Sequence, residues 1–310
     1  MLRRKLRAMS VSSSYLEDGR ARAKINLTLH VGRVIADGRY KGYHPVDSLV
    51  AFAGAADRIK YCPKPKDFQF EIQGPFGEGL EADNDNLITR TAHAFFERLN
   101  VAPFGKFILE KNLPIASGIG GGSADAAAAL RLLLRENKEL AKDIEQSEIL
   151  AMAEALGADV PVCFHSKTSF MRGIGEQIEL LDEVGRIPAL LVNPGFGVST
   201  AEIFKAYDAV ERAIDPAPQL KSGSLLERVK AGRNDLQDIA ISLRPEIGQL
   251  IEQISETPGC LLSRMSGSGA TCFGLFTSFD KVVEARDIIS HAHPNYWFAP
   301  TLLGDASWSS

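Results

Sequence analysis

The chain has 310 residues, a formal net charge of −4, 45% hydrophobic residues and 24% charged residues. These proportions are ordinary for a globular protein, and they exclude a disordered chain, a collagen-like repeat and a disulfide-rich scaffold. The acidic balance argues against nucleic acid as a partner, because nucleic-acid binding favours basic surfaces. No apolar run reaches the roughly 18 to 20 residues that cross a bilayer, so we expect no membrane contact.

The cysteines and the start of the chain indicate a reducing compartment. The four cysteines form no C-x-x-C pair and no zinc-like spacing. The first twenty residues lack the apolar segment of a secretory signal. We therefore expect a cytoplasmic protein that is a monomer or a weak homodimer, with a flexible tail over residues 1–20.

The first half of the chain predicts strands followed by helices. Residues 25–31 alternate between apolar and polar, which predicts a half-buried strand with Lys24, Asn26 and Thr28 on its polar face. Further strands are expected over residues 46–53, 58–62, 68–72 and 107–109, and a helix over 86–99. A helix opening at Ser123 and another over 148–156 complete this half.

The second half predicts a strand over residues 189–193 and a helix over 200–211, capped by Ser199 or Thr200. A long loop over 215–224 precedes helices over 235–243 and 246–254, a strand over 271–276, a helix from about 281 and a tail. Because strands cluster before helices, we expect an α+β fold. We place an N-terminal domain at residues 21–172 and a C-terminal domain at 173–310.

The glycine-rich segment 114–122 predicts a phosphate site. Glycines permit positive φ and close approach of backbone N–H groups, and the N-terminus of the following helix attracts anions. The segment is not a P-loop, because it lacks the lysine that a P-loop requires. It is not a dinucleotide-binding fingerprint starting at Gly118 either, because Ser123 stands where that motif needs glycine. Glycine content alone is also compatible with another interpretation, a flexible loop that ends where Ser123 caps the following helix.

The full motif is more specific. The string P-x-x-x-G-x-G-G-G-S-x-D at residues 114–125 resembles the ATP loop of the GHMP kinases. Four more segments match that family in order, A-K-I-N-L at 23–27, G-Y-H at 42–44, G-A-D-V-P-V at 157–162 and R-M-S-G-S-G-A at 264–270. The resemblance implies a ribosomal S5 domain 2-like N-terminal domain, a ferredoxin-like C-terminal domain and an active site between them.

By this resemblance Lys24 and Asp159 are the catalytic pair. A carboxylate can take the proton of a substrate hydroxyl, and a nearby ammonium neutralises developing charge. The resemblance also implies that ATP binds with Mg²⁺, for which Ser123 is the candidate protein contact and no other ligand is assigned. The implied ATP-binding residues are Pro114, Ile115, Ala116, Ser117, Gly118, Ile119, Gly120, Gly121, Gly122, Ser123, Ala124, Asp125, Asn86 and Leu87.

The acceptor implied by the resemblance carries a cytidine diphosphate group. Asn26 and His44 would hold the cytosine edge, while Tyr43 and Phe204 would flank the base. The implied reaction is ATP-dependent phosphorylation of the 2-hydroxyl of 4-diphosphocytidyl-2-C-methyl-D-erythritol, in the non-mevalonate route to isoprenoids. The family usually joins Asp-Gly directly to Tyr-His, whereas residues 39–42 intervene here. The alternatives are a homoserine- or mevalonate-type kinase of the same family and a non-catalytic binding module on the same fold.

Overall fold

The computed structural model describes residues 17–181, 185–210 and 223–304. Its first part combines long strands with a group of helices. The elements are β1 (Glu17–Asn26), β2 (His30–Val31), β3 (Val46–Cys62), β4 (Phe68–Gln73), α2 (Leu87–Arg98), β5 (Gly105–Glu110), α3 (Gly121–Glu136), α4 (Lys138–Ala141), α5 (Gln146–Leu156), α6 (Val160–His165), β6 (Ser169–Gly173) and β7 (Gln177–Leu180).

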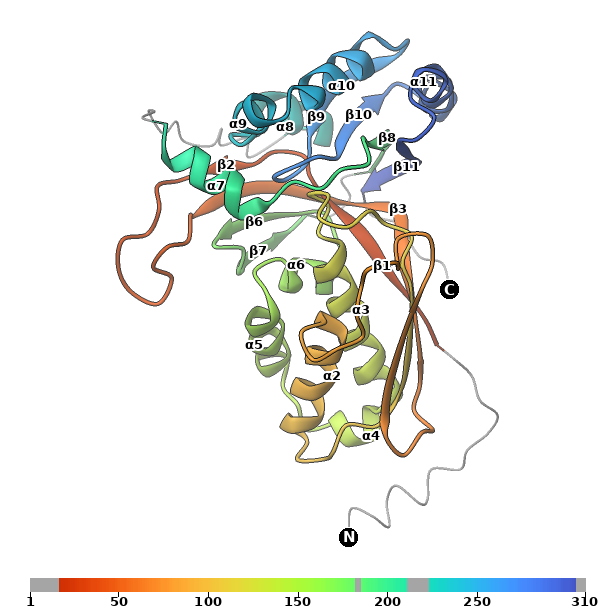
Figure 1. Cartoon of the computed structure of the whole chain (residues 1–310). Coiled ribbons are helices and arrows are strands. Elements are labelled where there is room, and N and C mark those ends of the chain that lie inside the picture. The colour runs from red at the N-terminus through yellow and green to blue at the C-terminus, as the bar shows by residue number, and fades with distance from the viewer. Residues whose placement is uncertain (1–16, 182–184, 211–222, 305–310) are drawn as a thin grey trace.

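The second part places four helices between its first and second strands. It contains β8 (Arg186–Asn193), α7 (Thr200–Asp208), α8 (Leu225–Ala231), α9 (Gln237–Leu243), α10 (Pro245–Glu256), β9 (Cys260–Met265), β10 (Cys272–Phe276), α11 (Phe279–Ala292) and β11 (Trp297–Gly304). Figure 1 shows α2, α3, α5 and α6 gathered beside the N-terminal strands, with α8 to α11 at the opposite end of the molecule. The predicted α+β class is confirmed.

All described strands belong to one eleven-stranded sheet, with a main path in the order β4-β5-β3-β11-β8-β10-β9. The long strand β3 organises the N-terminal part, because β1, β2, β5 and β6 all pair with it antiparallel. We expected two strands, over 46–53 and 58–62, and this was wrong: β3 continues through residues 54–57. The extended pairing with β1, including Arg22↔Ala56 and Ala21↔Asp57, holds that stretch in the sheet.

The predicted strand 25–31 is interrupted. β1 ends at Asn26 and β2 begins at His30, because the backbone between them changes partners. Leu27 and Thr28 both donate to the Leu49 carbonyl, after which Leu29 donates to Arg233 and accepts from Asp235. The two amides that share one carbonyl form a β-bulge, after which His30 and Val31 pair with β3 again, while Leu29 bonds to residues 233–235 of the C-terminal half. Residues 17–20, which we expected in the tail, instead form the start of β1.

The end of the chain returns to the sheet. We expected a tail after the last helix, but β11 pairs with β8 along its whole length and touches β3 at Leu303↔Ala53. Elements β9 and α8 were also not predicted. The domain boundary that we placed between residues 172 and 173 falls within the antiparallel hairpin of β6 and β7. The loop expected over 215–224 lies mostly outside the described residues.

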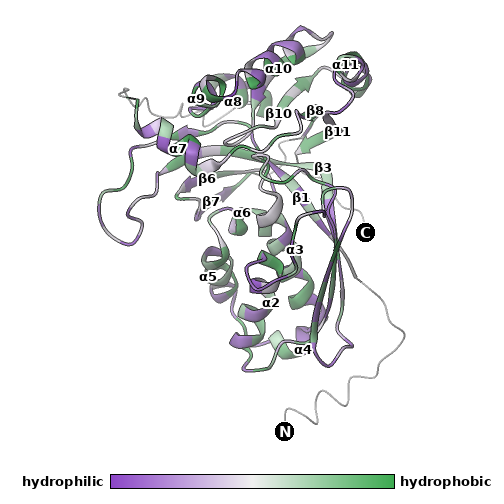
Figure 2. Ribbon diagram, viewed as in Figure 1, coloured by the Kyte–Doolittle hydropathy of each residue, from purple (hydrophilic) through white to green (hydrophobic). Residues whose placement is uncertain are grey.

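The apolar side chains form three buried clusters, and Figure 2 shows hydrophobic residues on strands and helices of both halves. One cluster joins α2 and α3 to the N-terminal strands, and a second joins α10 and α11 to the C-terminal strands. The third lies between the halves and contains Ile25, Leu49, Leu191, Phe273 and Leu303. Because this third cluster buries side chains from both halves, it fixes their orientation around the space that they enclose.

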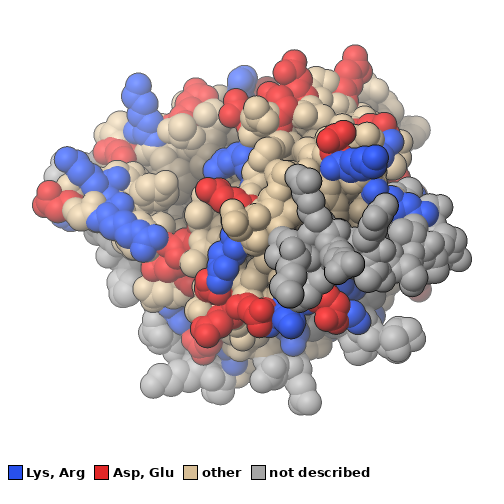
Figure 3. Space-filling model, turned by 90° about the horizontal axis from the view of Figure 1, so that it is seen from below, with Lys and Arg blue, Asp and Glu red and all other residues tan. Residues whose placement is uncertain are grey.

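The face seen in Figure 3 carries acidic and basic side chains intermixed. A long polyanion binds best to a continuous basic surface, and this face does not present one. No helix among the described residues is both long enough and apolar enough to span a bilayer.

Candidate functional site

A cavity of about 1120 Å³ opens between the two halves. Its walls come from β1, the glycine-rich loop, the start of α3, residues 158–159, α7 and residues 267–268. Every site residue named from the sequence lines this cavity except Ile119 and Ala124, which point into the buried clusters. The site therefore brings together residues that are widely separated in sequence.

The glycine-rich loop directs a helix N-terminus into the cavity. Gly118 and Gly120 have φ of +75° and +63°, values that side-chain-bearing residues rarely adopt. The first intrahelical bond of α3 runs from the Ala124 amide to the Gly120 carbonyl. The amides before it have no partner within the helix, which makes this end suited to phosphate. Gly120, and not Ser123 as we expected, precedes the helix, and it makes no side-chain cap.

Lys24 and Asp159 meet beside this helix end. Lys24 Nζ lies 2.6 Å from Asp159 Oδ1, and the exposed fractions of the two side chains are 4% and 34%. The Lys24 backbone amide donates to the Ile119 carbonyl of the glycine-rich loop at 2.9 Å. A Cβ on Gly120 would lie only 3.8 Å from Asp159 Oδ2. The second carboxylate oxygen therefore faces the place where the loop enters α3.

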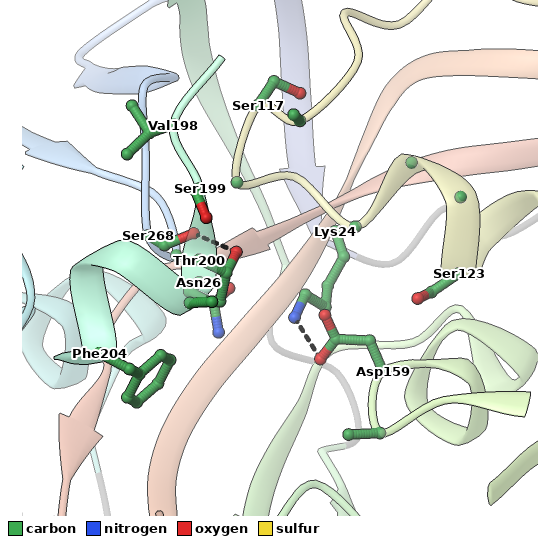
Figure 4. A pocket seen from close by; sticks show the side chains of 18 of the residues that line it. Lys24, Asn26, Ser117, Ser123, Asp159, Val198, Ser199, Thr200, Phe204 and Ser268 are labelled. Atoms are coloured by element: carbon green, nitrogen blue, oxygen red, sulfur yellow. Dashed lines mark hydrogen bonds and ion pairs between the residues drawn. The ribbon is translucent and has the colours of Figure 1, made fainter. Parts of the chain in front are cut away.

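Figure 4 shows Lys24 and Asp159 at the centre of the site, with Ser123 on one side and Asn26, Thr200 and Phe204 on the other. The Asn26 amide is oriented by a 2.8 Å hydrogen bond to the Ser48 hydroxyl. Thr200 and Ser268, which sequence reasoning did not select, exchange a hydroxyl–hydroxyl bond of 2.9 Å. The pair is thus flanked by the N-terminus of α3 on one side and by a second end with amide, hydroxyl and aromatic groups.

The second end contains an oriented histidine. His44 Nε2 donates to Asp208 Oδ1 at 2.7 Å, and the His44 and Phe204 rings lie 4.8 Å apart at an interplanar angle of 34°. A neutral imidazole that donates through Nε2 keeps Nδ1 as an acceptor. Tyr43 is 53% exposed at the cavity edge. Asp208 was missed from the sequence, because nothing local marks a carboxylate at the end of a helix as the partner of a distant histidine.

The extra residues 39–42 form part of a hairpin between β2 and β3. Its arms join where Ile35 donates to the Tyr43 carbonyl and accepts from Gly42. Near the tip, the Tyr40 hydroxyl and the Arg39 guanidinium both donate to Glu154 Oε1, at 2.9 and 3.0 Å. Glu154 lies on α5, so the insertion links the wall that carries Tyr43 to the helix that precedes Asp159.

A buried ionic cluster supports the glycine-rich loop from below. Lys111 Nζ lies 2.6 Å from both Asp57 Oδ2 and Asp125 Oδ2, and all three side chains are at most 6% exposed. Asp57 Oδ1 accepts from the backbone amides of Asn112 and Leu113. Burial lowers the pKa of Lys111, but the charges of Asp125 and Asp57 outweigh it and leave that pKa raised. The cluster ties the residues before the loop to the helix after it.

Asp125 differs from its partners in this cluster. Its Oδ1 is buried and has no hydrogen-bond partner among the described residues. Burial raises the pKa of Asp125 well above that of an ordinary aspartate, against the opposing charge of Lys111. Asp125 lines the cavity wall, but its carboxylate is engaged by Lys111. The geometry therefore makes Asp125 an anchor of α3.

The described residues contain no group of three or more His, Cys, Asp or Glu side chains that could hold a metal ion. The Ser123 hydroxyl, in the first turn of α3, lies on the cavity wall. A divalent cation that arrives with nucleotide phosphates keeps most of its ligands as phosphate oxygens and waters. The site therefore fits a cation carried by the nucleotide and does not form a cage of its own.

Comparison with known proteins identifies the family. Residues 86–167 match the GHMP kinases N-terminal domain, and residues 217–295 match the GHMP kinases C-terminal domain. A 4-diphosphocytidyl-2-C-methyl-D-erythritol kinase of Parvibaculum lavamentivorans is 43% identical over 92% of this chain and 97% of its own. The enzyme of the same name from Rhizobium etli is 42% identical over 91% of this chain and 93% of its own.

A solved structure agrees with the sequence matches. The crystal structure of a 4-(cytidine 5'-diphospho)-2C-methyl-D-erythritol kinase superposes with a TM-score of 0.74 at 29% identity, covering 94% of this chain and all of the other. The similarity includes both halves of the chain. The chain belongs to the GHMP kinase family.

Proposed function

We propose that this protein transfers the γ-phosphoryl group of ATP to the 2-hydroxyl of 4-diphosphocytidyl-2-C-methyl-D-erythritol, a step in the non-mevalonate route to isoprenoid precursors. The observation that carries the proposal is the position of the Lys24–Asp159 pair in the cavity, between the N-terminus of α3 and the end that contains Asn26 and His44. The relatives that bear this name match nearly the whole chain.

The reaction begins with ATP on the glycine-rich loop. The unpaired amides at the start of α3 bind its phosphates, and Asn86 and Leu87 at the start of α2 border its adenine. ATP brings Mg²⁺, which neutralises phosphate charge, and Ser123 is the residue placed to contact the ion. Positioning and electrostatic stabilisation account for most of the catalysis in phosphoryl transfer, and the fixed loop provides the first of these.

Asp159 then acts as the base. Lys24 occupies Oδ1, so Oδ2 is the oxygen that accepts the proton of the acceptor hydroxyl. The freed oxygen attacks the γ-phosphorus, the bond to the β-phosphate oxygen breaks, and ADP leaves. The Lys24 ammonium, almost fully buried, stabilises the negative charge that develops between acceptor and phosphate. General-base assistance of this kind contributes about 10²- to 10⁴-fold.

The other end of the cavity suits a cytidine group. A pyrimidine can stack on Phe204 and Tyr43, and base–aromatic stacking contributes about 1–3 kcal/mol per base. His44 Nδ1, left as an acceptor by the bond to Asp208, matches the amino group of cytosine. Homoserine and mevalonate have no aromatic ring to fill this end, so the pocket favours the cytidyl acceptor over these alternatives. The predicted cytoplasmic location and the monomeric or weakly dimeric state stay predictions.

The test is release of ADP in the presence of Mg²⁺ and ATP. We expect release that depends on the cytidyl compound and is absent with mevalonate, homoserine or no acceptor. Release with one of the other acceptors would move the protein to another activity of the family, and absence of release with every acceptor would favour a binding module. The parent is compared with Asp159→Asn and with Asp143→Asn, an exposed aspartate between α4 and α5.

Asp159→Asn should lower kcat by about 10²-fold or more and leave nucleotide affinity unchanged, while Asp143→Asn should behave like the parent. Undiminished turnover in Asp159→Asn would remove Asp159 from the role of base without affecting the substrate assignment.

A further inference from the structure

Two glycine-containing loops interlock where the halves of the molecule meet. A Cβ on Gly118, in the glycine-rich loop, would lie 2.5 Å from the Ser266 carbonyl oxygen. A Cβ on Gly267 would lie 2.7 Å from the Gly118 carbonyl oxygen. The Thr271 amide donates to the Ser117 carbonyl at 3.1 Å. The loop after β9 therefore supports the loop that precedes α3, with no space between their backbones for side chains.

Ser266 lies at the centre of this contact and is fully buried. Its hydroxyl accepts from the Asn26 backbone amide at 3.1 Å and donates to the Gly118 carbonyl at 3.0 Å. Asn26 belongs to the acceptor end of the cavity, and Gly118 belongs to the nucleotide end. One hydroxyl thus links the two ends through a continuous hydrogen-bond chain, in which each bond polarises the next.

The backbone around Ser266 is held independently of that hydroxyl. The Ser266 amide donates to the Thr271 carbonyl, and its own carbonyl accepts from Gly269. The Asn234 side-chain amide donates to both the Met265 and the Gly267 carbonyls at 2.9 Å. Removal of the hydroxyl should therefore leave the turn in place and interrupt only the link between Asn26 and Gly118.

We propose that Ser266 is a positioning residue that couples nucleotide binding at the glycine-rich loop to acceptor binding at Asn26. This inference rests on the proposed function, because it assigns the acceptor to the Asn26 end. When phosphates bind at the start of α3, the Gly118 peptide is held in place and the Ser266 hydroxyl is held with it. The Asn26 peptide is then already ordered when the acceptor arrives, which lowers the entropy cost of binding. By linkage, the acceptor must tighten the nucleotide by the same factor.

The experiment measures that factor directly. Calorimetry gives the Kd of the cytidyl acceptor with and without a saturating non-hydrolysable ATP analogue and Mg²⁺, for the parent, Ser266→Ala and Ser263→Ala. Ser263 is the matched control, since it lies on β9, the strand that leads to Ser266, and its hydroxyl donates to the Ile251 carbonyl, away from the cavity. We expect the analogue to tighten acceptor binding about 5-fold or more in the parent and in Ser263→Ala. In Ser266→Ala the tightening should fall below about 2-fold.

A parent without coupling, or a Ser266→Ala variant that keeps the coupling of the parent, would overturn the inference. If Ser266→Ala does not fold, Ser266→Cys replaces it, because a thiol fills the same space and is a much weaker hydrogen-bonding group; its coupling should also decrease. Failure of the proposed function has a different signature, since the parent would then not bind the cytidyl compound at all. A merely structural role for Ser266 would weaken both ligands without changing the ratio of the two Kd values.

Discussion

Replacement of Lys111 by methionine should destabilise the protein severely, although methionine has a similar length and suits a buried site. Lys111 Nζ is the shared donor for Asp57 and Asp125, and the side chains of the three residues are 5%, 0% and 6% exposed. Breaking a buried ion pair by removal of one partner costs about 3–5 kcal/mol, because an uncompensated charge stays behind. We therefore expect Lys111→Met to lower the free energy of unfolding by about that amount at pH 8.

The two carboxylates should bear this loss unequally. Asp57 keeps two donors, the backbone amides of Asn112 and Leu113. Asp125 loses the partner of Oδ2, and its Oδ1 already has none among the described residues. Double replacement, Lys111→Met with Asp125→Asn, removes the unpaired charge and should recover at least about 1 kcal/mol.

The pH dependence follows from the raised pKa of Asp125, which burial causes. Without Lys111 that pKa rises further, so the folded state keeps a proton that the unfolded chain loses near pH 4. The folded state then binds more protons than the unfolded state, and stability must fall as the pH rises from about 4 toward the folded-state pKa. The loss of unfolding free energy in Lys111→Met, relative to the parent, should thus be smaller at pH 5 than at pH 8, by up to about 1.4 kcal/mol for each pH unit.

Urea unfolding at the two pH values measures these differences. The control is Lys106→Met, because Lys106 on β5 forms a surface ion pair with Glu71 on the neighbouring strand β4, and its loss should cost less than about 1 kcal/mol. The reasoning is refuted if Lys111→Met stays within about 1 kcal/mol of the parent at pH 8, or if the added Asp125→Asn brings no recovery.

Three further outcomes are expected. Asp208→Ala frees His44 Nε2 and should raise the acceptor KM about 10-fold, a change of roughly 1.4 kcal/mol, with the ATP KM unchanged in steady-state assays. Tyr40→Phe removes one of the bonds that hold the 39–42 insertion to Glu154, and should raise the acceptor KM alone by about 2- to 5-fold; an equal rise in the ATP KM would argue against a local role. Leu303→Ala empties a fully buried position between the halves and should lower the unfolding free energy by about 2–5 kcal/mol, which urea unfolding can check.

Local sequence signals predicted the elements whose boundaries have local causes. The helix expected over 86–99 appears as α2, with Asn86 capping the Ile88 amide, and the Ser199 cap of α7 accepts from Glu202 as expected. The end of β1 at Asn26 has a different origin, because a bulge at Leu27 and Thr28 interrupts the pairing with β3 and Leu29 bonds to residues 233–235 instead. No pattern in residues 25–31 records that distant partner, so alternation alone made the strand too long.

The same distinction applies to the site. Motifs carry information on residues that contact ligands, and all the site residues named from motifs except Ile119 and Ala124 line one cavity. Motifs carry little information on the contacts that hold those residues in place. Ser266 was part of a recognised string, but its link between Asn26 and Gly118 depends on three segments that only the folded chain brings together. Asp208 was not found for the same reason.

Lys111 is different, because a signal for it exists in the sequence. Along β5 the buried positions are Gly105, Phe107 and Leu109, and the alternation places Lys111 next in the buried series while Lys106 falls on the other face. A lysine that the alternation places on the buried face of a strand predicts carboxylate partners buried with it, because burial of an unpaired ammonium costs too much free energy. Two aspartates satisfy that requirement, one from β3 and one from α3. The alternation that defines a strand therefore also locates the charge that ties the glycine-rich loop to the sheet.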